Sequence, residues 1–197
     1  MAHGKNWTTD PPFVSGEFLR LYDPYTHSLT VIQEPHRLAH DGMVFNVTGK
    51  LTGLISTGTQ DLLIQTGGAY MHLHRFLIAL GAGDIDIVTY EGATHSSAGT
   101  PLVVQNTNRN STNTSLASLS YTPTVTTTGT LLHSKWIVPT ATGVGPRPDT
   151  GISDLANGEE WILKPQTSYL IRLTNNSGGT ISLSFDFLWY EVSYVEG

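Results

Sequence analysis

The chain has 197 residues, the length of one large β-sandwich domain, and it contains no cysteine, which excludes disulfides and thiolate metal sites. Charged residues make up only 13% of the chain and the formal net charge is −6, so we expect neither a basic surface nor a nucleic-acid partner. No apolar run reaches the length of a bilayer span, so we expect no membrane partner. The absence of cysteine fits folding in a reducing cytoplasm.

The first 16 residues (MAHGKNWTTDPPFVSG) are mostly polar and contain the pair Pro11-Pro12. They lack the apolar stretch of a signal peptide. Their composition predicts an extended arm at 1–16, in front of a single domain at 17–197. We name Trp7, Pro11, Pro12 and Phe13 as the candidate partner-binding residues of this arm.

Short runs rich in β-branched and aromatic residues follow the arm, and glycine, proline and asparagine turns separate them. This pattern predicts strands and almost no helix. Many short strands joined by a few long connections indicate an all-β fold, a jelly-roll-like β-sandwich. Besides the block discussed next, the predicted strands cover 18–22, 28–33, 43–48, 51–56, 61–65, 101–106, 131–138, 160–163, 168–174 and 180–192.

The longest apolar block, 70–80 (YMHLHRFLIAL), is followed by the turn Gly81-Ala82-Gly83 and by the alternating run 84–88. A short glycine-rich turn between two such runs predicts a β-hairpin, and a helix of three turns over 70–80 is the alternative. The turn at 175–179 predicts a second hairpin. In a strand over the block, one face carries Tyr70, His72, His74 and Phe76, and the other carries Met71, Leu73 and Arg75.

Three polar segments do not fit the strand pattern: 92–99, 106–118 and 139–158. Loops of this length in a compact domain are commonly functional or covered by a partner. We therefore name Asn108, Arg109 and Arg147 as candidate partner-binding residues in these loops.

The pair His72-x-His74 is the strongest candidate for chemistry, because two residues on one face of a strand can bind the same metal ion. Asp84 and Asp86 on the next predicted strand are further candidate ligands, and so are His95 and His133. The cupin metal site also needs a carboxylate shortly after this pair, and the first glutamate comes only at Glu91. We therefore favour a structural role for these histidines over metal binding: they lie at an oligomer interface or bind backbone carbonyl groups.

A second histidine cluster lies early in the chain, where Pro35 and Gly42 limit any helix to one turn. We expect surface loop contacts there in preference to metal binding. The residues of this cluster are His27, Glu34, His36, His40 and Asp41.

No other arrangement for catalysis is present. The sequence lacks the G-x-S-x-G motif of a serine nucleophile and the phosphate-binding P-loop motif. The acidic pairs Asp84/Asp86 and Glu159/Glu160 suit exposed strand and turn positions, and Trp161 and Trp189 suit the core. We therefore expect no enzymatic activity and no cofactor.

The stretch 159–191 contains the motif Leu-Lys-Pro-x-Thr-x-Tyr, then Ile-Arg-Leu-Thr-Asn-Asn-Ser, and then a final aromatic-rich strand. Together with 90–111 (YEGATHSSAGTPLVVQNTNRNS), it resembles structural proteins of the virions of tailed bacteriophages. The two stretches cover about a quarter to a third of the chain.

This resemblance implies a jelly-roll capsid decoration, or cement, protein. Such a protein is a homotrimer made in the host cytoplasm that binds the major capsid protein, or other virion proteins, on the outer capsid surface and stabilises the shell. No short motif assigns the contact residues. A tail or head-fibre component that binds a host-surface glycan is the alternative, and a cupin-like metal-dependent enzyme is the third.

Overall fold

The structure is a computed structural model that describes residues 34–80, 83–137, 151–153 and 160–192. The chain divides into two units, Met1–Arg37 and Leu38–Gly197, and the second unit holds all the described strands. The predicted arm at 1–16, with Trp7, Pro11, Pro12 and Phe13, lies outside the described residues. The predicted strands at 18–22 and 28–33, His27, Glu159 and Arg147 also lie outside them.

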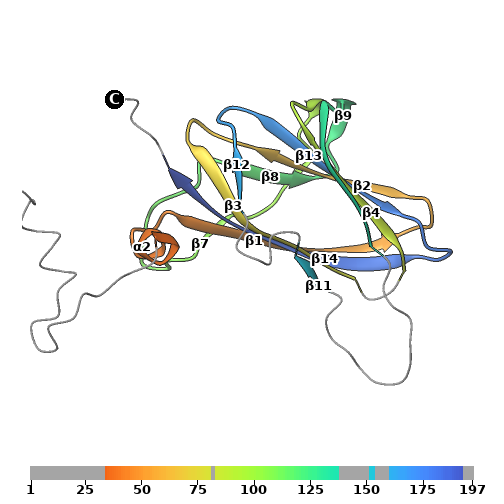
Figure 1. Ribbon diagram of the computed structural model, residues 1–197, viewed down its shortest axis with the longest axis horizontal. Helices are drawn as coiled ribbons and strands as arrows, with labels where there is room; N and C mark the ends of the chain where they lie inside the picture. Colours follow the sequence, from red (N-terminus) through yellow and green to blue (C-terminus); the bar gives the residue numbers. More distant parts are fainter. Residues whose placement is uncertain (1–33, 81–82, 138–150, 154–159, 193–197) are drawn as a thin grey trace, which may run out of the picture. The chain divides into compact units, whose positions relative to one another are not determined.

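Two antiparallel sheets face each other (Figure 1). Sheet I has the order β11-β3-β14-β1-β7, with β12 also paired to β3, and sheet II has the order β10-β4-β13-β2-β8-β6. A separate two-stranded ribbon pairs β5 (Thr94–Ser97) with β9 (Thr124–Thr127). The strands of sheet I are β1 (Val44–Leu54), β3 (Tyr70–Leu80), β7 (Gln105–Asn106), β11 (Gly151–Ser153), β12 (Trp161–Leu163) and β14 (Ile181–Val192). Those of sheet II are β2 (Thr59–Gln65), β4 (Ile85–Glu91), β6 (Thr100–Pro101), β8 (Ser118–Tyr121), β10 (Thr130–Ile137) and β13 (Ser168–Asn175).

The pairing of the main strands has a simple rule. The early strands pair with the late strands in reverse order: β1 with β14, β2 with β13, β3 with β12 and β4 with β10. A long antiparallel ribbon of this kind, wound so that successive pairs fall in opposite sheets, is a jelly roll. The predicted all-β jelly-roll sandwich is therefore confirmed.

Both predicted hairpins are wrong. The strands β3 and β4, on either side of Gly81-Ala82-Gly83, belong to different sheets, and so do β13 and β14, on either side of 175–179. Each turn is an arch between the sheets. At the second arch the buried side chain of Asn175 donates to the carbonyl oxygens of Leu54 and Gly179, both at 2.8 Å, and accepts from the backbone N–H of Ser177 at 2.9 Å. The turn residues were recognised correctly, but local sequence does not reveal which sheet receives the next strand.

The two strands predicted at 43–48 and 51–56 are one strand, β1, with a register shift between Leu51 and Leu54. Gly49 looked like a turn residue, yet it pairs with Phe185 inside the sheet. A Cβ atom at this position would lie 2.1 Å from the Phe185 ring. The glycine therefore makes room for an aromatic ring and does not end the strand.

The block 70–80 is the strand β3, so the helical alternative is wrong. The predicted division of its faces holds only as far as Leu73. The pairing with β14 passes from Leu73 directly to Arg75, which leaves His74 in a bulge. Beyond the bulge the alternation is reversed, so Phe76 faces the core together with Met71 and Leu73, while Arg75 is exposed.

The core lies between the two sheets and includes Trp189, Phe187 and Phe185 from β14 and Tyr169, Ile171 and Leu173 from β13. The alternation of β14 predicted this face correctly. Trp189 is buried as expected, and Trp161 is partly buried against the same core.

The sequence does not predict the strands β5, β8 and β9. The first lies in the predicted loop 92–99, and the other two begin at or after the end of the predicted loop 106–118. The short strands β5, β8 and β9 are rich in threonine and serine and carry little apolar alternation. The strand predicted at 101–106 is interrupted and supplies only the short strands β6 and β7. An apolar pattern is a weak signal for strands whose side chains are mostly exposed.

The helix α2 (Glu34–His40) has seven residues and exceeds the single turn predicted there. Proline is tolerated in the first turn of a helix, where its missing N–H has no partner to lose, so Pro35, the second residue of α2, does not limit the helix. Gly42, at φ +70°, ends it, with the N–H groups of Gly42 and Met43 donating to Ala39 and Leu38. Among the residues that the structure describes, no helix is long and apolar enough to cross a membrane.

Candidate functional site

A carboxylate, an imidazole and a phenol meet on the outer side of sheet I. His72 of β3 lies opposite Ile162 of β12 and Tyr190 of β14. The Nδ1 atom of His72 is 3.2 Å from Oε1 of Glu160, and the hydroxyl of Tyr190 donates to Oε2 of Glu160 at 2.7 Å. The rings of His72 and Tyr190 stack with their centroids 4.6 Å apart.

The environment of this cluster lowers the pKa of Glu160. Burial on its own would raise this pKa, but the hydrogen bonds from Tyr190 and His72 and the electrostatic interactions with His72 and His74 outweigh burial. His72 itself is only 4% exposed. The cluster therefore connects β3, β14 and the residue that precedes β12 through one ionised carboxylate.

The structure does not bring the predicted metal ligands together. His72 lies near the first residue of β3, whereas Asp84 and Asp86 follow its last residue. Eight residues of strand separate His72 from Leu80, which corresponds to about 26 Å. The Asp86 carboxylate instead accepts a hydrogen bond from Asn176 at 2.7 Å. In the described part of the chain, no group of three or more histidine or acidic side chains is placed to hold a metal ion.

The other histidines fall in three separate places. His95 lies in the ribbon strand β5, opposite Val125 of β9. His133 lies in β10, where its ring meets the edge of Trp161 at a centroid distance of 5.7 Å. His36 and His40 lie on α2, with Asp41 directly after it.

Among the loop residues predicted to bind a partner, Asn108 makes hydrogen bonds within the protein itself. Its side-chain amide donates to the carbonyl of His40 at 2.8 Å, and its Oδ1 atom accepts from the backbone of Asn110 at 3.1 Å. Arg109 is exposed and donates to Gln105 at 3.1 Å. Asn108 thus holds the loop 106–118 against the end of the helix, while Arg109 stays on the surface.

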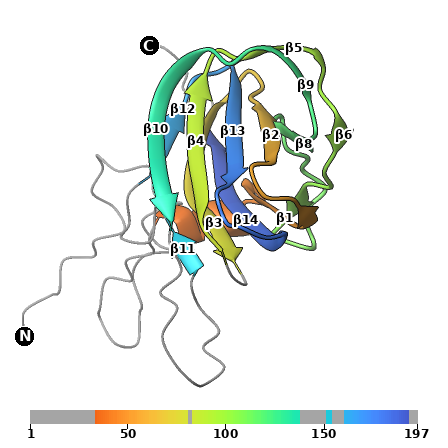
Figure 2. The ribbon, with the colours of Figure 1, turned by 90° about the vertical axis from the view of Figure 1, so that its right-hand side faces the viewer.

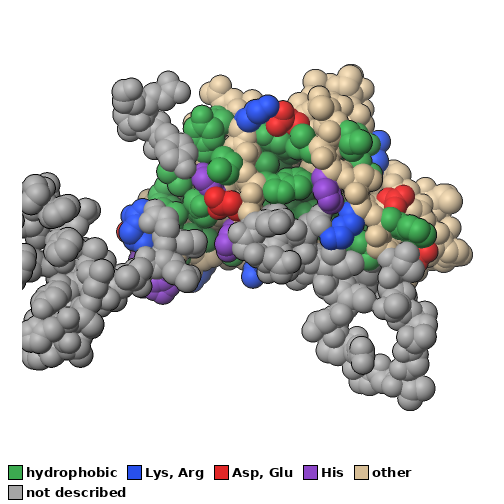
Figure 3. Space-filling model, viewed as in Figure 1, with side chains coloured by type: hydrophobic (Ala, Val, Ile, Leu, Met, Phe, Trp, Pro, Cys, Tyr) green, Lys and Arg blue, Asp and Glu red, His purple; other side chains and the backbone are tan. Residues whose placement is uncertain are grey.

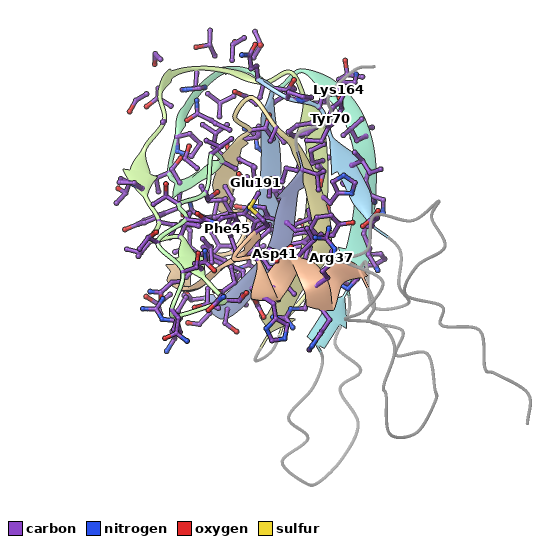
Figure 4. The ribbon with its side chains drawn as sticks, turned by 90° about the vertical axis from the view of Figure 1, so that its left-hand side faces the viewer. Arg37, Asp41, Phe45, Tyr70, Lys164 and Glu191 are labelled. Atoms are coloured by element: carbon purple, nitrogen blue, oxygen red, sulfur yellow. The ribbon has the colours of Figure 1, made fainter. Side chains whose placement is uncertain are left out.

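A buried glutamate that the sequence analysis missed anchors the same loop. Glu191 of β14 is 3% exposed and lies in the interior, whereas Lys164 lies at the periphery (Figure 4). Its carboxylate accepts hydrogen bonds from the hydroxyl of Ser115, from the backbone N–H groups of Leu116 (2.8 Å) and Ala117 (3.2 Å), and from the indole of Trp189 (3.0 Å). The available signal in the sequence was an acidic residue directly after the aromatic pair Trp189-Tyr190 of this strand.

Two further ion pairs lie in sheet II and the turn beside it. Asp61 and Arg172, which are neighbours on β2 and β13, form a bidentate pair with both contacts at 2.8 Å. The hydrogen bond to Asp61 raises the pKa of Arg172 more than burial lowers it. Glu91 accepts from Lys164 at 2.6 Å and from the hydroxyl of Tyr169 at 3.1 Å. These groups are fully engaged in structural contacts.

The surface feature without such a structural explanation is an apolar row on β10, the outermost strand of sheet II. Leu131, Leu132 and Trp136 are 57%, 45% and 64% exposed, and Ile162 on the adjacent edge of sheet I is 56% exposed. Figure 3 looks onto this side of the sandwich and shows apolar side chains gathered there, with few charged side chains among them. The sequence predicts this strand but not its position at the edge of the sheet.

No protein-family model matches the chain, and no curated protein matches it significantly.

Proposed function

We propose that this protein is a structural component of a virion, a capsid decoration protein that binds the outer surface of the shell and stabilises it. The observation that carries the proposal is the exposed apolar row of Leu131, Leu132 and Trp136 at the edge of a jelly roll. Exposed apolar patches mark surfaces where proteins associate, and these three side chains lie on one strand.

Two further features support the proposal. The polar groups of His72, Glu160 and Tyr190 bind one another, and these contacts connect the strands of sheet I. The chain is sparsely charged, with 13% charged residues, which suits a surface that packs against neighbours. Many modest contacts on a shell give strong overall binding because each further contact forms at a high effective concentration. The major capsid protein is the partner, and the outer capsid surface is the location.

Co-sedimentation with purified capsids tests this proposal. The wild-type protein is incubated with expanded and unexpanded capsids of the source virus, and bound protein is measured in the pellet. We expect saturable binding to the expanded capsid. The variant Trp136→Ser should bind at least about tenfold more weakly, because interface contacts concentrate in large aromatic side chains.

The matched control is Ile55→Ser, which removes another apolar side chain that is 65% exposed but lies in the turn between β1 and β2. This variant should bind like the wild type. The absence of wild-type protein from both capsid pellets would contradict the proposal.

The exposed indole of Trp136 also favours a second function, glycan binding by a tail or head-fibre component, because an indole combines a flat apolar face with a polar N–H group. A glycan array probed with the wild type and with Trp136→Ser separates the two functions. Saturable binding to a bacterial surface polysaccharide that is lost in the variant, together with no capsid binding, would favour the fibre component.

A further inference from the structure

Two adjacent residues near the end of β14 hold different parts of the chain on the two faces of sheet I. Glu191 is buried on the inner face, where its carboxylate accepts from two backbone N–H groups of loop 106–118, at 2.8 and 3.2 Å. Successive side chains of a strand point to opposite faces, so Tyr190 lies on the outer face. Its hydroxyl donates to Glu160, directly before β12, at 2.7 Å. One short piece of β14 therefore contacts both the loop and the start of β12.

The other part of the same loop binds the turn 40–42, which ends α2 and is called the helix-end turn below. The loop follows β7, the edge strand beside β1. Its asparagine side chains donate to three successive backbone carbonyl oxygens of the turn, with Asn108 bound to His40 at 2.8 Å, Asn113 to Asp41 at 3.1 Å and Asn106 to Gly42 at 2.9 Å. In Figure 4, Asp41 lies at the helix and Glu191 among the strands. The loop thus connects the interior of the sandwich with the helix-end turn.

The loop and the helix-end turn touch without space between them. A Cβ atom added to Gly42 would lie 2.1 Å from the hydroxyl oxygen of Ser111 and 2.5 Å from its Cβ atom. Gly42 also has a φ of 70°, which glycine adopts without strain. This glycine therefore both ends the helix and lets the loop lie directly against the turn.

The helix-end turn in its turn positions Leu38 over Tyr190. The N–H of Met43 donates to the carbonyl of Leu38 at 2.9 Å, and the N–H of Glu191 donates to the carbonyl of Met43 at 3.2 Å. Leu38, Val44 and Tyr190 form a small apolar cluster and are only 6%, 7% and 9% exposed. The contacts therefore form a closed circuit that leaves β14 at Glu191, passes through the loop and the turn, and returns to β14 at Tyr190.

Tyr190 extends this circuit toward the opposite edge of sheet I. Its ring stacks on His72 of β3 with the centroids 4.6 Å apart, and its hydroxyl binds Glu160. The strand β12 pairs with β3, whereas β7 pairs with β1 on the other side of β14. Figure 2 shows β12 and β1 on opposite sides of the sandwich. The loop at one edge and β12 at the other thus share the side chain of Tyr190.

The two attachments of the loop differ in strength. At the inner attachment a buried carboxylate accepts the hydrogen bonds, and bonds to a charged acceptor are about twice as strong as bonds between neutral groups. At the outer attachment, neutral amide groups donate to neutral carbonyls, and each such bond contributes little net stability. Local opening begins where the contacts are weakest. The loop should therefore detach first from the helix-end turn, while Glu191 keeps its other part in place.

We propose that loop 106–118 is a strap that locks this end of sheet I. While the strap is bound to the helix-end turn, Leu38 stays packed on Tyr190, and the phenol is held in position to bind Glu160. When the strap opens at the turn, Leu38 loses its support, Tyr190 gains rotamer freedom, and the start of β12 loosens at the opposite edge. A contact made at the exposed Arg109 of the strap and the order of β12 are thereby coupled. This inference goes beyond capsid decoration and does not depend on it.

Amide hydrogen exchange, measured by mass spectrometry on the full chain, tests the strap. The variant Asn113→Ala removes a bond to the helix-end turn. We expect exchange at least about tenfold faster than in the wild type at residues 38–43 and also at 161–163, because local opening exposes the amides of both segments. The matched control is Asn110→Ala in the same loop, since no contact of the circuit uses the Asn110 side chain. This control should exchange like the wild type.

A second variant separates the two halves of the circuit. Tyr190→Phe keeps the ring that packs on Leu38 and removes the hydroxyl that binds Glu160. Exchange should become faster at 161–163 and stay unchanged at 38–43. Adding Asn113→Ala to Tyr190→Phe should then accelerate 161–163 by less than about twofold, because effects that act through one shared contact do not add.

Three results would overturn the proposal. In the first, Asn113→Ala accelerates exchange at 38–43 and leaves 161–163 at the wild-type rate, so that opening of the strap does not reach β12. In the second, neither segment changes, so that the loop does not hold the helix-end turn. In the third, β13 in the core accelerates as much as 161–163, so that global unfolding explains the change. None of these results bears on whether the protein binds capsids.

Discussion

The phenol of Tyr169 lies at the border of the core, where its oxygen accepts a hydrogen bond from the backbone N–H of Lys164 at 2.8 Å and its O–H donates to Glu91 at 3.1 Å. Burial and the negative charge of Glu91 together raise the pKa of Tyr169 to about 12, although the bond from Lys164 lowers it. The hydroxyl therefore keeps its proton well above the ordinary value of 10.0.

A tyrosinate absorbance titration checks this. We expect a titration step near pH 12 that disappears in Tyr169→Phe. Because the folded pKa is raised, the contribution of Tyr169 to the free energy of unfolding is complete below pH 10 and is lost as the pH rises from about 10 to about 12. A titration curve identical in the wild type and the variant would contradict the assignment.

Glu160 gives the opposite dependence, at acidic pH. Its pKa lies below the model-compound value of 4.5, so its contribution to stability is present above that value and is lost as the pH falls through the folded pKa. Urea unfolding of the wild type and Glu160→Gln should show a difference at neutral pH that shrinks below about pH 4.5. A difference independent of pH would mean that the carboxylate charge does not stabilise the cluster.

Glu191 should be the most sensitive acidic residue, because its buried carboxylate accepts four hydrogen bonds. In Glu191→Gln one carboxylate oxygen becomes an NH₂ group that faces donors. We expect the free energy of unfolding to fall by about 2–3 kcal/mol. The comparison is Glu91→Gln, whose partner Lys164 is 67% exposed, and which should cost clearly less. Equal losses would show that burial at Glu191 is not decisive.

Single residues were the least predictable level. His72 was recognised as a residue with chemistry, but its partner Glu160 lies 88 positions later in the chain, and nothing local indicates that pairing. Asp84 and Asp86 were placed near His72 only because a hairpin was expected. Trp189 was placed correctly, since strict alternation in β14 depends on no distant residue.

At the scale of elements, the strands with clear alternation were found nearly at their observed bounds, for instance 168–174 against Ser168–Asn175. Errors arose at bulges and glycines. The bulge at His74 reverses the two faces of β3. The sequence YMHLHRF does not indicate this bulge, because an unbroken strand is also compatible with its residues. In the sequence Gly49 suggests a turn. In the structure its missing side chain leaves room for the ring of Phe185.

Gly99 and Gly129 both have φ 86° and lie against the backbone of another segment, at Tyr121 and Glu91 respectively. Alanine at either position must adopt φ 86° and must also displace backbone atoms nearer than 2.5 Å to its Cβ. We expect each of Gly99→Ala and Gly129→Ala to lower the free energy of unfolding by more than about 2 kcal/mol, through backbone strain and overpacking. Chemical denaturation measures both values.

The control is Gly53→Ala. Gly53 has a similar φ of 78°, but nothing lies within 4 Å of the added Cβ, so only the backbone cost of about 1–2 kcal/mol applies. If the three variants lose equal stability, the close backbone approach at Gly99 and Gly129 does not contribute.

At the scale of the whole molecule, composition and turn spacing were sufficient for the jelly roll, because low charge, many short strands and long connections are global features. The strand partners were not accessible from sequence. Every main pair joins an early strand with a late one, as β1 with β14, so the pairing depends on contacts that no local window contains.

This topology predicts slow folding. Proteins dominated by pairings between distant residues fold in milliseconds to seconds, since a large loop must close before a contact forms. Refolding followed by stopped-flow tryptophan fluorescence should report this timescale, with Trp189 as the buried probe. A refolding phase in microseconds would contradict the assigned strand order.

The reversed pairing order also fixes when each part can form during synthesis on a ribosome. Among the four main pairs, β4 and β10 are separated by the shortest stretch of chain, so this pair can assemble first. Then β12 reaches β3, β13 reaches β2, and β14 reaches β1. Among the described strands β1 emerges first and β14 last, so the edge of β1 that pairs with β14 stays open until residues 181–192 leave the exit tunnel. The nascent chain thus closes from its middle outward.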